Sequence, residues 1–155
     1  MCWQCDHPGA TRQDYLDVLH GIVATNGWAV QYVETEPPFA YTVGLSGAGL
    51  PELLITGLAP PRSMLLLNTV AQYMRDKTVP TAGDTMTFPD GSCAEFVRVA
   101  TPDAHLGWAV AFHGGPIRAL QIAWRDARGH SPWCPDFNEG GPRQPVLGIR
   151  GPACG

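Results

Sequence analysis

Residues 28–58, WAVQYVETEPPFAYTVGLSGAGLPELLITGL, decide the fold of this chain. Apolar and polar side chains alternate over residues 28–34, which is typical of a strand with one buried face. A pair of prolines ends that run, and residues 40–45 form a second apolar segment before a glycine-rich turn. Residues 51–58 hold three consecutive apolar side chains, which indicates a more deeply buried strand. Three successive strands are therefore predicted.

Helices are predicted on both sides of these strands. Upstream, Thr11 and Asp14 have the spacing of a capping box, and apolar side chains then recur at three- and four-residue intervals. Gly27 suits the left-handed conformation in which helices often end. Downstream, a proline pair begins a second helix at Pro60, whose apolar face extends to Met74.

The rest of the chain predicts a hairpin, a third helix and a last strand. Two strand segments, over residues 84–88 and 93–100, are joined by a Pro-Asp-Gly turn. Thr101 is expected to cap a helix that runs to about Phe112, and residues 117–124 form the last strand. The class is therefore α+β, with a mostly antiparallel sheet, about three helices and an irregular Gly/Pro-rich tail over residues 127–155.

The composition predicts one domain. The chain has 155 residues, of which 45% are hydrophobic, enough for a single core. We expect a globular domain over residues 1–155, with a cysteine-containing N-terminal segment at 1–10 and the tail at 127–155 docked on the body. The net charge is −4, and the ten lysine and arginine residues are scattered singly, so binding to nucleic acid is not expected.

The expected compartment follows from the apolar runs and the cysteines. No apolar run approaches the roughly 18 residues that a membrane helix needs. The N-terminal segment lacks the basic and apolar regions of a signal peptide. We therefore expect a cytoplasmic protein that does not bind membranes, whose five cysteines are reduced thiols or metal ligands.

The sequence begins MCWQCDHPG, in which Cys2 and Cys5 form a C-x-x-C pair. Two thiolates at this spacing can bind one zinc ion, but a full site needs two more ligands. The candidates are His7, His105, His130, Cys134, Asp136 and Cys154. We predict Zn²⁺ at Cys2 and Cys5, with Cys134 as the preferred third ligand and His7 or His105 as the fourth. A redox pair and two unbonded thiols remain as alternatives.

Polar residues in otherwise apolar strands suggest a pocket for a small molecule. The candidates are Tyr41, Thr42, Glu52, His105, Gln121, Trp124 and Asp126. Glu52 follows a proline at the entry of a strand, and His105 is in the first turn of the predicted third helix, where the helix dipole favours a neutral imidazole. The alternative interpretation is that Glu52 and Asp126 hold turns and that Gln121 faces water.

The sequence contains, in order, the segments FAYTVGL, LPELLITGL, PDAHL, ALQIAWRDARGHSPW and RQPVLG. Together they resemble the bacterial domain-of-unknown-function family numbered 4262, and the likeness extends from Thr11 to Gly148. Three positions depart from similar sequences: Cys134 replaces a frequent aspartate, His113 replaces a frequent tyrosine, and His130 replaces a bulky residue or an arginine. The family is defined by sequence, so the resemblance implies no particular activity.

Three functions are compatible with these observations. The first is a small accessory domain that binds a ligand or a protein partner without turning over a substrate. The second is a metal-dependent enzyme with Cys and His ligands, and the third is a thiol-based redox or metal sensor. The sequence has neither a G-x-S-x-G nucleophile motif nor a nucleotide-binding or flavin-binding motif. These absences favour the accessory domain.

Overall fold

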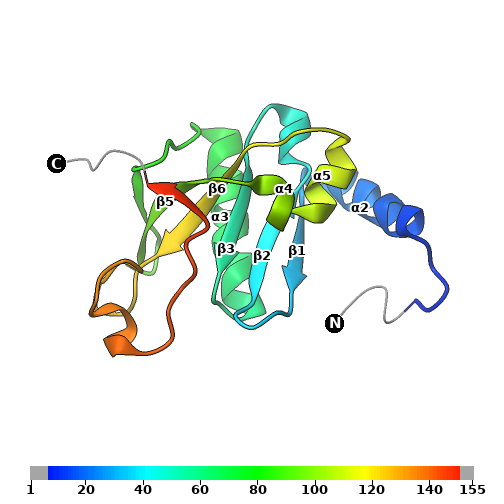
Figure 1. Cartoon of the computed structure of the whole chain (residues 1–155). Coiled ribbons are helices and arrows are strands. Elements are labelled where there is room, and N and C mark those ends of the chain that lie inside the picture. Colours follow the sequence, from blue (N-terminus) through cyan, green and yellow to red (C-terminus); the bar gives the residue numbers. More distant parts are fainter. Residues whose placement is uncertain (1–6, 151–155) are drawn as a thin grey trace.

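The computed structural model describes residues 7–150, and these fold around a single mixed sheet (Figure 1). The described strands are β1 (Ala29–Val33), β2 (Phe39–Val43), β3 (Glu52–Thr56), β4 (Thr85–Thr87), β5 (Cys93–Val99), β6 (Ala119–Trp124) and β7 (Gly148–Arg150). Their order is β1-β2-β3-β6-β5-β4, and β7 pairs with the second half of β5. All pairs are antiparallel except β3 with β6, so the predicted α+β class and mostly antiparallel sheet are confirmed.

Helices cover both faces of the sheet. The helices are α2 (Arg12–Asn26), α3 (Pro60–Asp76), α4 (Pro102–His105) and α5 (Gly107–His113). Figure 1 shows α3 behind the sheet, whereas α2 and α5 lie together at its β1 end. Strand alternation separates the two cores, because Val30 and Tyr32 pack with α3 while Ala29 and Val33 pack with α2 and α5.

The start and end of α2 agree with the prediction. The Asp14 amide donates to Thr11 Oγ1 at 3.1 Å, and the Thr11 amide donates to Asp14 Oδ2 at 2.8 Å, which completes the capping box. Gly27 ends the helix with a φ of +93°. The positive φ favours glycine, and a Cβ atom there would lie 1.6 Å from Nη1 of Arg75, so a larger residue would have to displace that guanidinium.

The predicted third helix is two short helices. Leu106 separates α4 from α5 with φ −103° and ψ 55°, and its side chain is fully buried. Thr101 precedes α4 but makes no capping hydrogen bond through its side chain, so this part of the prediction is wrong. We attribute the break to Leu106, whose burial in the core takes precedence over helical geometry beside the poor helix former Gly107.

The tail contains a strand that the sequence analysis did not predict. Gly148 begins β7 and lies against β5, where a Cβ atom would be 1.9 Å from the carbonyl oxygen of Arg98. The preceding residues pack on the same sheet face as α2 and α5, since Leu147 belongs to their core. The tail therefore extends the layer that these helices form.

Across residues 7–150, no helix has both the length and the apolar character that a membrane span requires.

Candidate functional site

The main candidate site is a cleft of about 510 Å³ between the β1–β2 end of the sheet and the helices on that face. Its floor comes from the two strands and its walls from the start of α2 and the α4–α5 corner. Prominent lining residues are Arg12, Gln31, Phe39, Tyr41, His105 and Trp108. We refer to it below as the β1–β2 cleft.

Strand register builds the floor of the β1–β2 cleft. Gln31 pairs with Tyr41, and Val33 pairs with Phe39, so all four side chains project from one face. The Phe39 and Tyr41 rings stack with centroids 6.2 Å apart. The floor is therefore aromatic and apolar, with the Gln31 amide as its polar group.

The walls are tied to this floor by contacts of Trp108. Its backbone N–H donates to the Tyr41 hydroxyl at 3.0 Å, and the Tyr15 ring meets its indole edge-on at 4.6 Å. The Arg12 guanidinium lies over the same indole, 4.9 Å from the ring centroid. Tyr15 also donates its hydroxyl proton to Gln31 Oε1. The helices and strands thus hold the β1–β2 cleft in one arrangement.

Besides the Gln31 amide, the floor carries the buried hydroxyl of Tyr41, which stays protonated up to high pH. Burial raises its pKa to about 12, even though the hydrogen bond from the Trp108 amide lowers it. The hydroxyl oxygen accepts from Trp108, and within residues 7–150 its own proton has no acceptor. Tyr41 can therefore donate to a bound molecule.

Two other pocket candidates, Thr42 and Glu52, lie outside the β1–β2 cleft in a buried network. Glu52 is fully buried, and its Oε1 accepts from Thr42 Oγ1 at 2.8 Å and from the Leu45 amide at 3.2 Å. Its Oε2 accepts from the amides of Gly44 and Ser46 and from the Ser46 hydroxyl. Burial raises the Glu52 pKa, while these bonds lower it in part. The carboxylate therefore holds a turn.

Gln121 and Trp124, also pocket candidates, hold the tail. Gln121 is fully buried, donates through Nε2 to the Pro145 carbonyl at 2.7 Å, and accepts at Oε1 from the Leu147 amide at 2.7 Å. The Trp124 indole donates to the Thr56 carbonyl at 2.8 Å. The side-chain polar groups of Gln121 and Trp124 are therefore hydrogen-bonded to the backbone of the protein and not directed at a ligand pocket.

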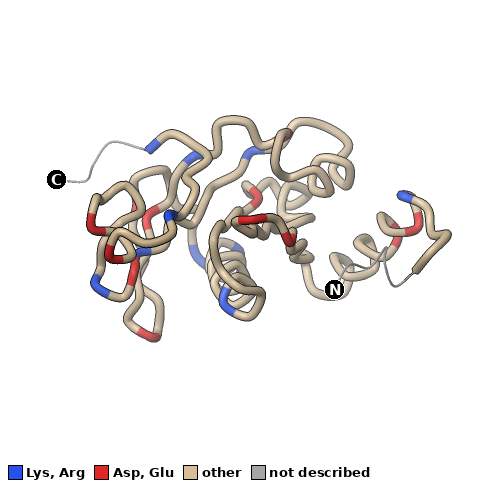
Figure 2. Tube along the Cα trace, turned by 60° about the horizontal axis from the view of Figure 1, so that its bottom comes forward, with Lys and Arg blue, Asp and Glu red and all other residues tan. Residues whose placement is uncertain are grey.

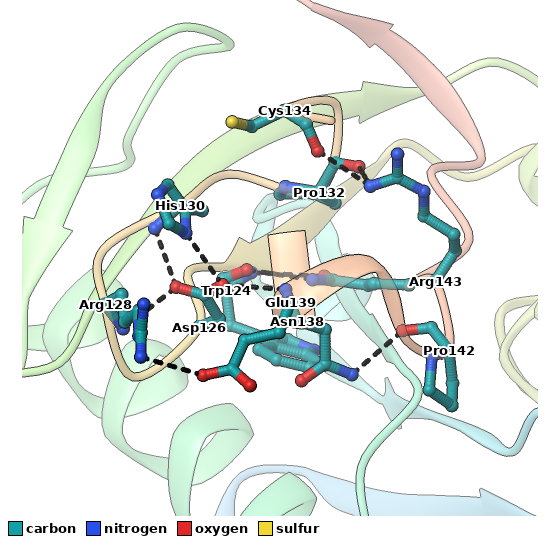
Figure 3. Close-up of polar contacts among 11 residues, drawn as sticks. Trp124, Asp126, Arg128, His130, Pro132, Cys134, Asn138, Glu139, Pro142 and Arg143 are labelled. Atoms are coloured by element: carbon teal, nitrogen blue, oxygen red, sulfur yellow. Dashed lines mark hydrogen bonds and ion pairs between the residues drawn. The ribbon is translucent and has the colours of Figure 1, made fainter. Parts of the chain in front are cut away.

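The remaining pocket candidate, Asp126, organises the loop after β6 (Figure 3). Its Oδ1 accepts from the amides of Arg128 at 2.9 Å and His130 at 2.8 Å. Its Oδ2 accepts from the Asn138 amide at 2.7 Å and lies 3.1 Å from His130 Nδ1. Burial raises the Asp126 pKa, but these hydrogen bonds lower it by more, to about 2. Of the seven pocket candidates, only Tyr41 and His105 line the β1–β2 cleft.

Of the predicted metal ligands, the structure describes Cys134 and the two alternatives for the fourth position, His7 and His105. Cys2 and Cys5 lie outside the described residues, as does Cys154. The segment that begins at His7 and the loop that carries Cys134 lie at opposite ends of the molecule (Figure 1). Cys134 instead shares its surroundings with His130 and Asp136, two of the residues that the sequence offered as additional ligands.

Four residues that shape the β1–β2 cleft were not predicted from the sequence: Arg12, Gln31, Phe39 and Trp108. The alternation over residues 28–34 held a usable signal for one of them. It placed Trp28, Val30 and Tyr32 on one face, which left Gln31 as a polar side chain on the opposite face.

These features define a one-domain α+β protein with an aromatic cleft. The chain belongs to the family DUF4262, a domain of unknown function, whose model matches residues 22–138. That match confirms the resemblance stated above and covers the floor of the β1–β2 cleft, its α4–α5 wall and the loop around Asp126. No curated protein and no solved structure matches the chain.

Proposed function

We propose that this protein is an accessory domain that binds a small molecule in the β1–β2 cleft. The observation that carries the proposal is an aromatic floor and wall held in place around a buried donor, Tyr41. A volume of about 510 Å³ suits a small-molecule site. The walls are positioned by contacts within the protein, so a ligand need not order them, and this reduces the free-energy cost of binding.

The lining favours a planar ligand with an anionic group. Phe39, Tyr41 and Trp108 offer ring faces and edges to a flat apolar body. Arg12 lies at the rim beside Trp108, where it can bind a carboxylate, and Tyr41 supplies a further donor. Glu34 also lines the cleft, and it disfavours a ligand with two negative groups.

The charge distribution supports a small ligand or a protein partner more than a nucleic acid. Figure 2 shows lysine and arginine residues spread over the described chain, with aspartate and glutamate among them. Phosphate backbones bind to clustered cations, because affinity grows with the number of phosphates that are neutralised. A single arginine at the cleft rim is instead suited to one carboxylate.

The experiment uses cinnamate as a planar carboxylate probe and cinnamamide as its neutral counterpart. Amide chemical shifts of Gln31, Phe39, Tyr41 and Trp108 should move during titration with cinnamate. Arg12→Gln should weaken cinnamate binding roughly fivefold, the value of a partly exposed charge-assisted hydrogen bond, and leave cinnamamide unaffected.

A matched control is available because Arg75 also lies over an indole, that of Trp28, 5.7 Å from its ring centroid. Arg75→Gln should leave cinnamate binding unchanged, since Arg75 is not part of the β1–β2 cleft. Shifts confined to other regions, or equal binding of both probes by the parent and Arg12→Gln proteins, would contradict the proposal.

Two further expectations belong to this proposal. The first is a cytoplasmic location, in which reducing conditions keep the cysteines as thiols; cell fractionation tests it. The second is Zn²⁺ at Cys2 and Cys5, which is tested by elemental analysis of the parent and of the Cys2→Ser/Cys5→Ser variant. Retention of all metal by that variant would show that the pair is not a ligand set.

A further inference from the structure

The loop after β6 brings three different metal-ligating side chains together. One ligand atom each from His130, Cys134 and Asp136 lies within 4.8 Å of the other two. Zinc binds imidazole nitrogen, thiolate sulfur and carboxylate oxygen at about 2.0–2.3 Å, so ligand atoms around one tetrahedral ion are roughly 3.3–3.6 Å apart. Side-chain rotation can close the remaining gap, because Asp136 is exposed.

The histidine is already oriented by a carboxylate. His130 Nδ1 lies 3.1 Å from Asp126 Oδ2. This contact, dashed in Figure 3, leaves Nε2 as the ring nitrogen available to an ion. Metal-binding histidines commonly donate their other N–H to a carboxylate, which fixes the tautomer and makes the ligand more basic. Asp126 is itself held by the amides of Arg128 and Asn138.

The backbone around the cysteine is also held in place. The Cys134 amide donates to the Ser131 carbonyl at 2.9 Å, and the Cys134 carbonyl accepts from the Phe137 amide at 3.0 Å. Arg143 donates to the same carbonyl at 2.7 Å (Figure 3). Phe137 is fully buried against Trp124, with ring centroids 5.3 Å apart, and anchors the segment. The ligand positions are therefore set by packing that is independent of an ion.

We propose that His130, Cys134 and Asp136 bind one zinc ion, with Asp126 as the residue that positions His130. A thiolate and a carboxylate balance the two positive charges of Zn²⁺, and the imidazole completes three protein ligands. A fourth, open position then takes water or a small ligand, as in zinc sites that are not purely structural. This site is separate from the β1–β2 cleft and does not use Cys2 or Cys5.

The test is a titration with Co²⁺ of the Cys2→Ser/Cys5→Ser protein, which removes the N-terminal pair as a source of thiolate. We expect one equivalent of cobalt to bind, with a thiolate-to-cobalt charge-transfer band that added Zn²⁺ displaces. Adding Cys134→Ser should abolish the band. Adding Cys93→Ser should leave it unchanged, since Cys93, the other described cysteine, is not part of the ligand group.

Two further variants distinguish ligation from positioning. Asp136→Asn changes an exposed side chain and should weaken Co²⁺ binding at least tenfold without unfolding the protein. Asp126→Asn should weaken binding by about 10- to 100-fold while keeping the charge-transfer band, because the thiolate ligand is still present.

The proposal is overturned if the charge-transfer band survives Cys134→Ser, or if the Cys2→Ser/Cys5→Ser protein shows no band. Should Cys134→Ser fail to fold by circular dichroism, the Asp136→Asn titration and the imidazole signals of His130 in the folded parent decide. Zn²⁺ should shift those signals at one equivalent, and the absence of a shift also overturns the proposal.

Discussion

The same face of the sheet is open at one end and closed at the other. A row of register partners crosses this face from Gln31 through Tyr41 and Leu54 to Gln121 and Val97. At the β1 end, Gln31 and Tyr41 line the β1–β2 cleft. At the β6 end, Gln121 is fully buried beneath the tail.

The difference shows that a polar side chain on a buried sheet face can serve two purposes. Gln121 has no access to solvent, and its amide pairs with the backbone of Pro145 and Leu147. Gln31 pairs with one hydroxyl group, from Tyr15, beside open space. A fully paired amide specifies how a segment docks, whereas one beside a cleft is available to a ligand.

The largest expected effect comes from replacing the buried amide. Gln121→Leu should lower the free energy of unfolding by about 3 kcal/mol, because it leaves the Leu147 amide without its acceptor and removes the donor to Pro145. Gln31→Leu should cost less than about 1 kcal/mol, since it removes one bond at a partly open position. Urea denaturation of both variants checks this, and equal costs would contradict the comparison.

The pH dependence of stability tests whether Tyr41 is buried in the floor of the β1–β2 cleft, at the open end of this sheet face. Its pKa is raised by burial to about 12, so folding favours the protonated form. Stability from this group is present below pH 10, the ordinary value, and is lost as the pH rises through about 12, by roughly 3 kcal/mol in all.

Tyr41→Phe should therefore flatten the fall in unfolding free energy between pH 10 and pH 12. The matched control is Tyr73→Phe, because Tyr73 is 38% exposed. Chemical denaturation across this range measures the difference. A slope that is the same in the parent and in Tyr41→Phe would show that Tyr41 is not the buried group that titrates there.

Local signals were sufficient for much of the fold. Thr11 and Asp14, which form the capping box, are only three residues apart in the sequence. The alternation over residues 28–34 indicates one strand and which side chains lie on each of its faces. Both predictions were confirmed, because the interactions that determine them lie within a few residues.

Features that depend on distant partners were not predicted. The strand β7 forms because Gly148 fits against Arg98, fifty positions earlier in the chain, and nothing next to Gly148 indicates this. Likewise, the sequence marked Gln121 as unusual but could not tell a ligand contact from a tail contact. The β1–β2 cleft itself arises where Arg12, from a helix, approaches Trp108.

The C-terminal end of α2, at the opposite end of the helix from Arg12, gives a smaller effect. Gly27→Val should lower the free energy of unfolding by about 1 kcal/mol or more, because φ is +93° and the new side chain would displace Arg75. Gly21→Ala is the control, as it lies inside α2 with no atom within 4 Å of the added carbon. It should raise stability by up to about 1 kcal/mol. Thermal melts that show no change for Gly27→Val would contradict this account of the helix end.

The smallest effect compares the two threonines that precede the helices of the cleft walls. Thr11 accepts the Asp14 amide at 3.1 Å, so Thr11→Ala should cost about 1 kcal/mol. Thr101 makes no such bond and is exposed, so Thr101→Ala should cost less than about 0.5 kcal/mol.

Urea denaturation of both variants measures these costs. Chemical shifts of residues 12–15 should lose helical character in Thr11→Ala, while those of 102–105 should not change in Thr101→Ala. An equal cost at the two positions would mean that Thr101 caps α4 in solution. In that case the first turn of α4 would be stabilised as much as that of α2, and this helix would hold His105 at the β1–β2 cleft. In the present structure the burial of the neighbouring Leu106 holds His105 there instead.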